Sequence, residues 1–232
     1  MSYLPAILTL LLTATFVLSP LVTPPFAGFT ADQLPIPQVD PPVQPAGYAF
    51  SIWGLIYVWL SVSALFGLFA RGDDPDWDVP RIPLIVSLAV GTPWLWIATV
   101  SPVWATVTIF VMLLTAIAAL TQSPSRHIWL FRVPVGLYAG WLTAAAFVSL
   151  GSTLAGYGIG LDQVGWAYAC IAMALIVALA VQARMGDAPA YGLAVIWALV
   201  GIVVINVPEQ PWVALTAAAG AAIVSADILR RA

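Results

Sequence analysis

Charge is scarce in this sequence, and lysine is absent. Only 7% of the 232 residues are charged, whereas soluble domains carry about 25%. The seven basic residues are all arginine. Without a lysine amine, the chain cannot form a retinal or pyridoxal Schiff base or build a phosphate-binding loop of the lysine type.

Histidine and cysteine occur once each, as His127 and Cys170. One of each cannot build a zinc site or an iron–sulfur cluster, and a single cysteine cannot form an internal disulfide. The formal net charge of −3 and the lack of a basic run argue against nucleic acid as a partner. No ionisable residue lies near the centre of any hydrophobic run, which argues against an ion-coupled pump or a voltage sensor.

Hydrophobic residues make up 62% of the chain, and they gather in long runs separated by proline, glycine and charge. A membrane-spanning helix needs about 20 mostly apolar residues, and a helix satisfies its own backbone amides in lipid. The runs therefore predict an all-α polytopic membrane protein with about eight transmembrane helices and the lipid bilayer as its surroundings. The predicted spans are residues 4–22, 48–70, 82–100, 103–122, 131–154, 164–183, 190–206 and 211–229.

The arginines support this count independently of hydropathy. Cytoplasmic loops retain arginine, whereas translocated loops lack it. If the N-terminus is cytoplasmic, eight spans place every arginine on the cytoplasmic side, and both termini lie there. The first run is expected to stay as a helix rather than to be a cleaved signal peptide, because Met1–Tyr3 contains no basic residue. The arginines are Arg71, Arg81, Arg126, Arg132, Arg184, Arg230 and Arg231.

Three further sequence features are best explained by structural roles rather than by ligand binding. Trp104, Trp129, Trp166 and Trp212 at helix starts are typical of interfacial anchors. Small residues at Gly136 and Gly140, and in the run 217–222, permit close helix contact, either inside the bundle or across a homodimer. The acidic group at 73–78 resembles a solvated turn rather than a metal site, because calcium-loop spacing is missing.

The longest predicted loop, residues 23–47, contains seven prolines. Proline blocks helix formation, so we expect an extended, stiff segment, which we call the strap. A long loop in a protein with few loop residues is often a binding element. The strap leads directly into Phe50, Trp53 and Tyr57, whose spacing places them on one face of the second helix.

This second helix resembles the corresponding helix of the TspO/MBR family of tryptophan-rich sensory proteins. The family motif Pro-Pro-x-Trp-Val-Phe-x-x-Val-Trp-x-x-Leu-Tyr has its counterpart in residues 45–57, with Tyr48 in the place of the first tryptophan and one residue fewer before Trp53. The fifth-helix motif Pro-Tyr-x-x-Trp-x-x-x-Ala is matched by Tyr138, Trp141 and Ala145. Leu137 replaces its proline, and only Trp94 and Trp96 remain of the third-helix motif.

The resemblance covers residues 1–155 and implies a five-helix module there. It says nothing about the three additional helices that the hydrophobic runs predict in residues 156–232. It also implies a bacterial inner (plasma) membrane location and a pocket under the strap that binds porphyrins and other flat apolar ligands, often in a dimer. No cofactor follows with certainty, but a tetrapyrrole ligand is consistent with the resemblance. The implied ligand-binding residues are Tyr48, Phe50, Trp53, Tyr57, Trp94, Trp96, Tyr138, Trp141 and Ala145.

Three functions are compatible with these observations. The first is a non-enzymatic membrane binding or sensory protein for a hydrophobic small molecule such as a porphyrin. The second is a small-solute transporter in which the three additional helices complete a path. The third is an accessory subunit of a larger membrane complex. Catalysis has the least support, because the bundle contains no nucleophile paired with a base.

Overall fold

A computed structural model describes residues 3–231 of the chain. These residues contain eight spans long and apolar enough to cross a membrane, and no β-strand. The predicted all-α architecture is therefore confirmed. The α-helices are α1 (Leu4–Leu18), α2 (Ile52–Arg71), α3 (Pro75–Gly91), α4 (Trp94–Val100), α5 (Pro102–Thr121), α6 (Arg132–Gly156), α7 (Gln163–Met185), α8 (Pro189–Asn206) and α9 (Pro211–Arg231). Short 3₁₀ turns are η1 (Ser19–Leu21), η2 (Ala31–Gln33), η3 (Gly47–Ser51) and η4 (Ile128–Leu130).

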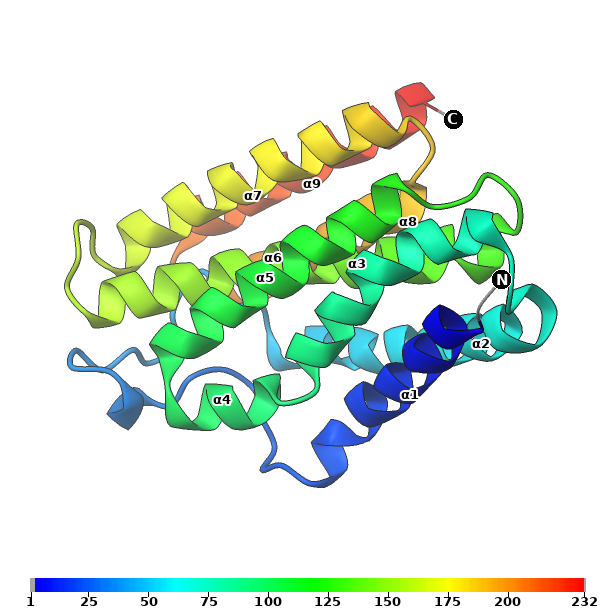
Figure 1. The fold of residues 1–232 in the computed structure, drawn as a ribbon. Coiled ribbons are helices and arrows are strands. Elements are labelled where there is room, and N and C mark those ends of the chain that lie inside the picture. Colours follow the sequence, from blue (N-terminus) through cyan, green and yellow to red (C-terminus); the bar gives the residue numbers. More distant parts are fainter. Residues whose placement is uncertain (1–2, 232) are drawn as a thin grey trace.

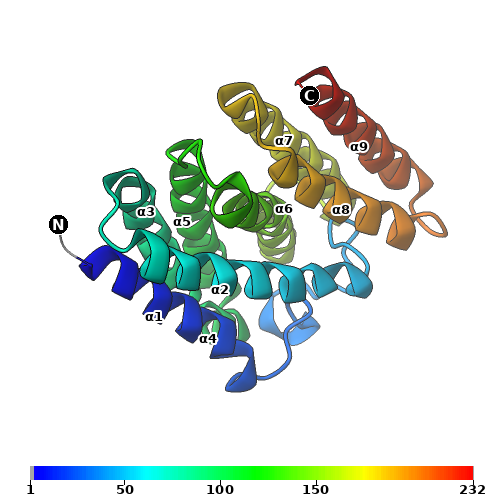
Figure 2. The ribbon, with the colours of Figure 1, turned by 90° about the vertical axis from the view of Figure 1, so that its right-hand side faces the viewer.

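Helix α6 lies at the centre of the molecule and packs against α2, α5, α7 and α8. Helices α1–α5 lie on one side of α6, and α7–α9 lie on the other (Figure 2). The start of α1 and the end of α9 are at the same end of the bundle (Figure 1). Alternating helix directions bring the loops and helix ends that carry arginine to this end, which we call the arginine end.

Small residues allow α6 and α8 to approach closely. A Cβ atom at Gly140 would collide with the carbonyl oxygen of Tyr191, and one at Gly136 would lie 3.3 Å from the Tyr191 amide. On α9, a Cβ at Gly220 would lie 2.9 Å from the Leu175 side chain of α7. Both small-residue stretches noted in the sequence therefore contact other helices of the same chain.

The third span begins at Pro75, seven residues before the predicted start. Asp74 caps α3, since its carboxylate accepts a hydrogen bond from the amide of Asp76 at 3.0 Å. Proline at the first helical position and two aspartates in the first turn, Asp76 and Asp78, complete a favourable helix start. The acidic group predicted as a solvated turn therefore opens the helix instead.

Two spans are separated at Ser101, as predicted. Helix α3 ends at Gly91, and the chain continues after Pro93 as α4, which completes the third span. Ser101 then caps α5, because its hydroxyl oxygen accepts a hydrogen bond from the amide of Trp104 at 3.3 Å. The break between α3 and α4 turns α4 toward the strap (Figure 1).

The strap lies at the end of the bundle opposite the arginines (Figure 1). The amide of Ile36 donates to the carbonyl of Gly156 at 2.8 Å, and the side chain of Gln33 donates to the carbonyl of Ala98 at 2.9 Å. The Thr30 hydroxyl holds the pKa of the Asp32 carboxyl below its ordinary value by hydrogen bonding. The hydrogen bonds of Ile36 and Gln33 hold the strap against α6 and α4.

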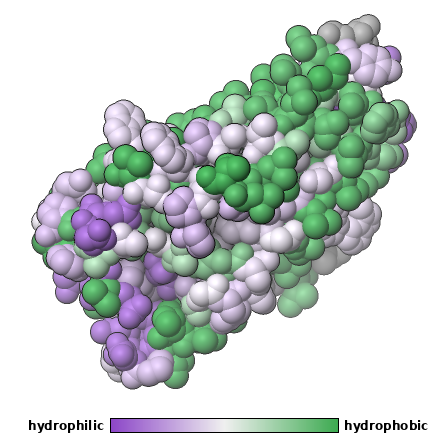
Figure 3. Space-filling view, turned by 90° about the horizontal axis from the view of Figure 1, so that it is seen from below, coloured by the Kyte–Doolittle hydropathy of each residue, from purple (hydrophilic) through white to green (hydrophobic). Residues whose placement is uncertain are grey.

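Apolar side chains cover much of the molecular surface, as expected for a protein surrounded by lipid. In Figure 3 they extend over the right-hand part of the face shown, whereas hydrophilic side chains gather at the left, where the strap lies. Trp104, Trp129 and Trp212 are strongly exposed, which agrees with the predicted anchoring role. Trp166 is only half-buried, and its indole nitrogen donates to the carbonyl of Ile159 at 2.7 Å.

Candidate functional site

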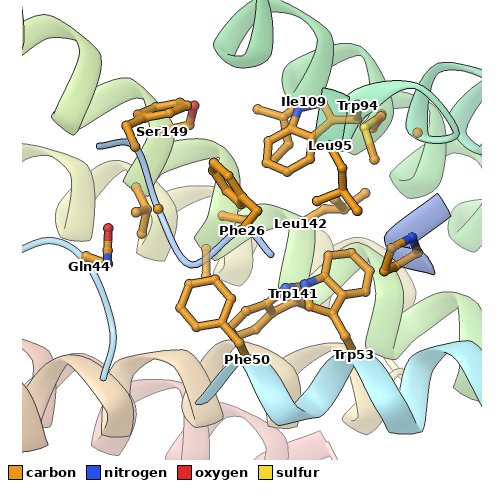
Figure 4. A pocket seen from close by; sticks show the side chains of 18 of the residues that line it. Phe26, Gln44, Phe50, Trp53, Trp94, Leu95, Ile109, Trp141, Leu142 and Ser149 are labelled. Atoms are coloured by element: carbon orange, nitrogen blue, oxygen red, sulfur yellow. The ribbon is translucent and has the colours of Figure 1, made fainter. Parts of the chain in front are cut away.

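A cavity of about 270 Å³ lies beneath the strap, enclosed by α1 to α6. The strap forms its roof with Phe26, Phe29 and Gln44, and the first turns of α2 and the middle of α6 form its opposite wall. Figure 4 shows Phe50, Trp53 and Trp141 together on this wall. The side chains that line the cavity come from residues far apart in the sequence, so the cavity exists only in the folded bundle.

Aromatic rings from η3, α2 and α6 form one continuous cluster in that wall. The rings of Trp53 and Tyr57 stack with centroids 5.3 Å apart. Trp141 meets the ring of Phe50 at 5.7 Å and that of Trp53 at 6.3 Å, both edge to face. Phe16 of α1 closes the cluster by edge contacts with Trp53 and Tyr57. Such contacts fix ring orientations and present flat apolar surfaces to a ligand.

The roof is also aromatic. Phe26 meets the ring of Trp94 edge to face at 5.3 Å, and Phe29 contacts Phe26 at 5.9 Å. The amide group of Gln44 donates to the carbonyl of Ala27 at 2.9 Å, so that one part of the strap holds another. Aromatic side chains therefore face the cavity from both above and below.

Most polar groups near the cavity are already bonded within the protein. The Ser149 hydroxyl lies 2.7 Å from the hydroxyl of Thr106, and the Trp94 indole nitrogen donates to the carbonyl of Ala105 at 3.0 Å. The indole nitrogen of Trp141 is buried and has no hydrogen-bond partner among residues 3–231. Within the same range, no cluster of three or more His, Cys, Asp or Glu residues could hold a metal. The site is thus suited to apolar burial and stacking.

A protein-family comparison identifies the kind of protein to which this cavity belongs. The model of a family described as TSPO-like protein matches residues 5–230. The chain belongs to the TSPO-like family. The matched range includes α7, α8 and α9 as well as the helices that enclose the cavity. Searches of curated proteins and of solved structures gave no match.

The structure brings six of the nine residues implied by the family resemblance to the cavity. Their side chains line it together, although they come from η3, α2, α4 and α6. The aromatic motifs of the second and fifth spans therefore meet at one place in this TSPO-like protein. These six residues are Phe50, Trp53, Tyr57, Trp94, Trp141 and Ala145.

The other three residues lie outside the cavity lining. Tyr138 is fully buried behind it, and its hydroxyl lies 2.9 Å from that of Ser87. Trp96 is 61% exposed on the outer face of α4. Residues two apart on an α-helix differ by about 200° in direction, so Trp94 and Trp96 cannot face the same cavity. Tyr48 is 46% exposed and packs on Trp197 of α8.

The cavity residues that were not predicted include three aromatic ones and one amide: Phe16, Phe26, Phe29 and Gln44. Phe26 and Phe29 belong to the strap, which was predicted as a binding element without any of its side chains being selected. The sequence could have identified both as candidate ligand-binding residues, because they are aromatic residues in a loop that is predicted to cover a pocket. Phe16 carries no such signal, because it is one apolar residue within a wholly apolar helix.

Proposed function

We propose that this TSPO-like protein is an integral membrane binding or sensory protein that holds a flat apolar ligand in the cavity beneath the strap. The supporting observation is the single aromatic cluster that η3, α2 and α6 present to the cavity, opposite Phe26. Burial of apolar surface contributes roughly 25 cal/mol per Å², and stacking adds orientation. A tetrapyrrole such as a porphyrin fits this chemistry.

The size of the cavity limits how such a ligand is held. Its volume of about 270 Å³ is near the lower end of ligand pockets, about 300 Å³. We propose that it accepts a molecule of a few fused rings, or one edge of a tetrapyrrole whose remainder lies under the strap. Binding without turnover is part of the proposal, because no His, Cys, Asp, Glu or Arg lines the cavity within the described chain.

The test is a titration of the purified protein with protoporphyrin IX, followed by tryptophan fluorescence and by the porphyrin absorption band. We expect saturable quenching in the wild type. In the double variant Trp53→Ala/Trp141→Ala, the dissociation constant should rise at least about tenfold, which corresponds to 1.4 kcal/mol. The variant Ala145→Phe, which fills the cavity and keeps both tryptophans, should also weaken binding.

The matched control is Trp104→Ala/Trp212→Ala, which removes two exposed indoles outside the cavity. Its dissociation constant should stay within about twofold of the wild type, because surface substitutions away from a site have small effects. An absence of saturable quenching, or the same loss in both double variants, would contradict the proposed site.

A transporter remains the second candidate, and one observation disfavours it. In the transporter hypothesis α7, α8 and α9 complete a path, but no residue of these helices lines the cavity. Flux of protoporphyrin IX into proteoliposomes distinguishes the two functions, because a binding protein retains ligand without moving it. We also propose the bacterial plasma membrane as its location, with the arginine end facing the cytoplasm.

A further inference from the structure

Helix α8 contacts the end of the strap and the turn η3 that follows it through three hydrogen bonds. The side chain of Asn206 donates to the carbonyl of Pro42 at 2.8 Å, the amide of Ala46 donates to the carbonyl of Gly201 at 3.1 Å, and the indole nitrogen of Trp197 donates to the carbonyl of Ala49 at 2.8 Å. Residues 206, 201 and 197 of α8 bond in this order to residues 42, 46 and 49, so the two segments run in opposite directions. The end of the strap therefore runs antiparallel to α8 along much of its length.

This contact is tightly packed. A Cβ atom at Gly201 would lie 2.8 Å from the Cβ of Pro45 and 3.0 Å from that of Ala49, so only glycine leaves room for the chain here. Asn206 is 3% exposed. A hydrogen bond lost at a buried site leaves its former acceptor unsatisfied, which is costly. Displacement of residues 42–49 from α8 is therefore unfavourable.

The same segment reaches the cavity. Gln44 and Pro45 line it, and the Gln44 side chain occupies the space beside Gly28, whose φ of +126° favours glycine. Gln44 also donates to the carbonyl of Ala27 at 2.9 Å, next to Phe26 in the roof. Residues 42–46 are thus held on one side by α8. On the other side, through the Gln44 side chain, they hold the part of the strap that covers the ligand site.

We propose that α8 holds the strap in place over the cavity, and that Trp197, Gly201 and Asn206 are positioning residues for ligand binding although none of them lines the cavity. This inference rests on the proposed function for its ligand. It assigns a role to the helices that follow the five-helix module: they supply the fixed support against which the roof is held.

The first test compares two glycine substitutions on α8. Gly201→Ala pushes Pro45 away from the helix, whereas Gly192→Ala places its Cβ against Gln182 and Ile228, on the side facing α7 and α9. With protoporphyrin IX, Gly201→Ala should accelerate dissociation about tenfold, and Gly192→Ala should change it less than twofold. Equal effects in the two variants would show a general packing defect and overturn the inference.

The second test measures the strap without ligand. Hydrogen–deuterium exchange of peptides from residues 24–46 should increase in Asn206→Leu, while peptides from α2 and α6 remain as protected as in the wild type. A strap that stays equally protected in Asn206→Leu overturns the inference, even if protoporphyrin IX does not bind the wild type. If protoporphyrin IX does not bind the wild type but the strap loses protection in Asn206→Leu, only the proposed ligand is wrong, so the two failures are distinguishable.

A milder variant covers the outcome in which the others do not fold. Trp197→Phe keeps an aromatic ring beside Tyr48 and removes only the N–H donor to Ala49. We expect about threefold faster dissociation and increased exchange at the end of the strap. Wild-type values for both measurements in Trp197→Phe would overturn the positioning role of α8.

Discussion

Arg81 is a buried charge that joins two helices at the arginine end. Its guanidinium donates to Asp78 at 2.7 Å, to the carbonyl of Gly67 at 2.6 Å and to the carbonyl of Arg71 at 2.9 Å. It also lies over the ring of Trp77 at 5.5 Å. The planar fork of donors can satisfy all three acceptors at once, so Arg81 fixes the end of α2 against the start of α3.

Arg81 substitutions should reveal this geometry. We expect Arg81→Lys to lower the free energy of unfolding by about 2 kcal/mol or more, because a single ammonium group cannot reach acceptors that the fork separates. Thermal unfolding in detergent measures the change. Arg230→Lys, at an exposed position, is the control and should stay within about 0.5 kcal/mol. A wild-type melting temperature for Arg81→Lys would refute a role for the fork.

Individual residues also mark the limit of sequence-based site prediction. Phe50, Trp53 and Tyr57 could be placed on one face because helical spacing fixes their relative direction. The direction of Trp96 relative to the cavity depends on how α4 is rotated against its neighbours, which no local pattern encodes. The unpaired indole nitrogen of Trp141 is likewise visible only in the assembled bundle.

At the scale of elements, the spans were predictable because each depends on its own run of apolar residues. The start of α3 was missed because acidic residues were interpreted by their charge rather than as helix-capping groups. The pairing of α6 with α8 could not be chosen from sequence, since the small residues at Gly136 and Gly140 are compatible with any close neighbour. Only the structure identifies Tyr191 on α8 as the group that they face.

Two neighbouring glycines of α6 should respond differently to the same substitution. Gly140→Ala would place its Cβ against the carbonyl of Tyr191, whereas Gly136→Ala has 3.3 Å to the nearest atom. Overpacking a tight contact costs about 1–3 kcal/mol. We expect Gly140→Ala to lower the unfolding temperature clearly and Gly136→Ala to lower it much less. The reverse order would mean that α6 and α8 approach each other elsewhere along their length.

At the scale of the whole molecule, the two ends of the bundle differ in charge and in structure. Arginine side chains gather at one end, where Arg71 lies 2.7 Å from His127 and Arg132 lies 3.2 Å from Asp187. The strap occupies the other end. This asymmetry predicts one orientation in the membrane, with the strap outside the cytoplasm.

Cysteine labelling can test the orientation directly, because the native Cys170 is buried. In intact spheroplasts, a membrane-impermeant maleimide should label Val39→Cys in the strap. It should label Ser125→Cys, in the loop between α5 and α6, only after the membrane is permeabilised. Both positions are exposed, and the unsubstituted protein serves as the control for background at Cys170. Immediate labelling of Ser125→Cys with protection of Val39→Cys would reverse the assigned topology.

The hydrogen bonds between α8 and residues 42–49 have one further consequence. On the strap side, each of them uses a main-chain carbonyl or amide: Pro42, Ala46 and Ala49 contribute no side-chain donor or acceptor. Attachment therefore depends on the path of the backbone and on the Gln44 side chain, which joins the two parts of the strap, while the rings of Phe26 and Phe29 make no hydrogen bond. Replacing those two rings would redesign ligand preference on an unchanged framework, which makes this part of the roof exchangeable.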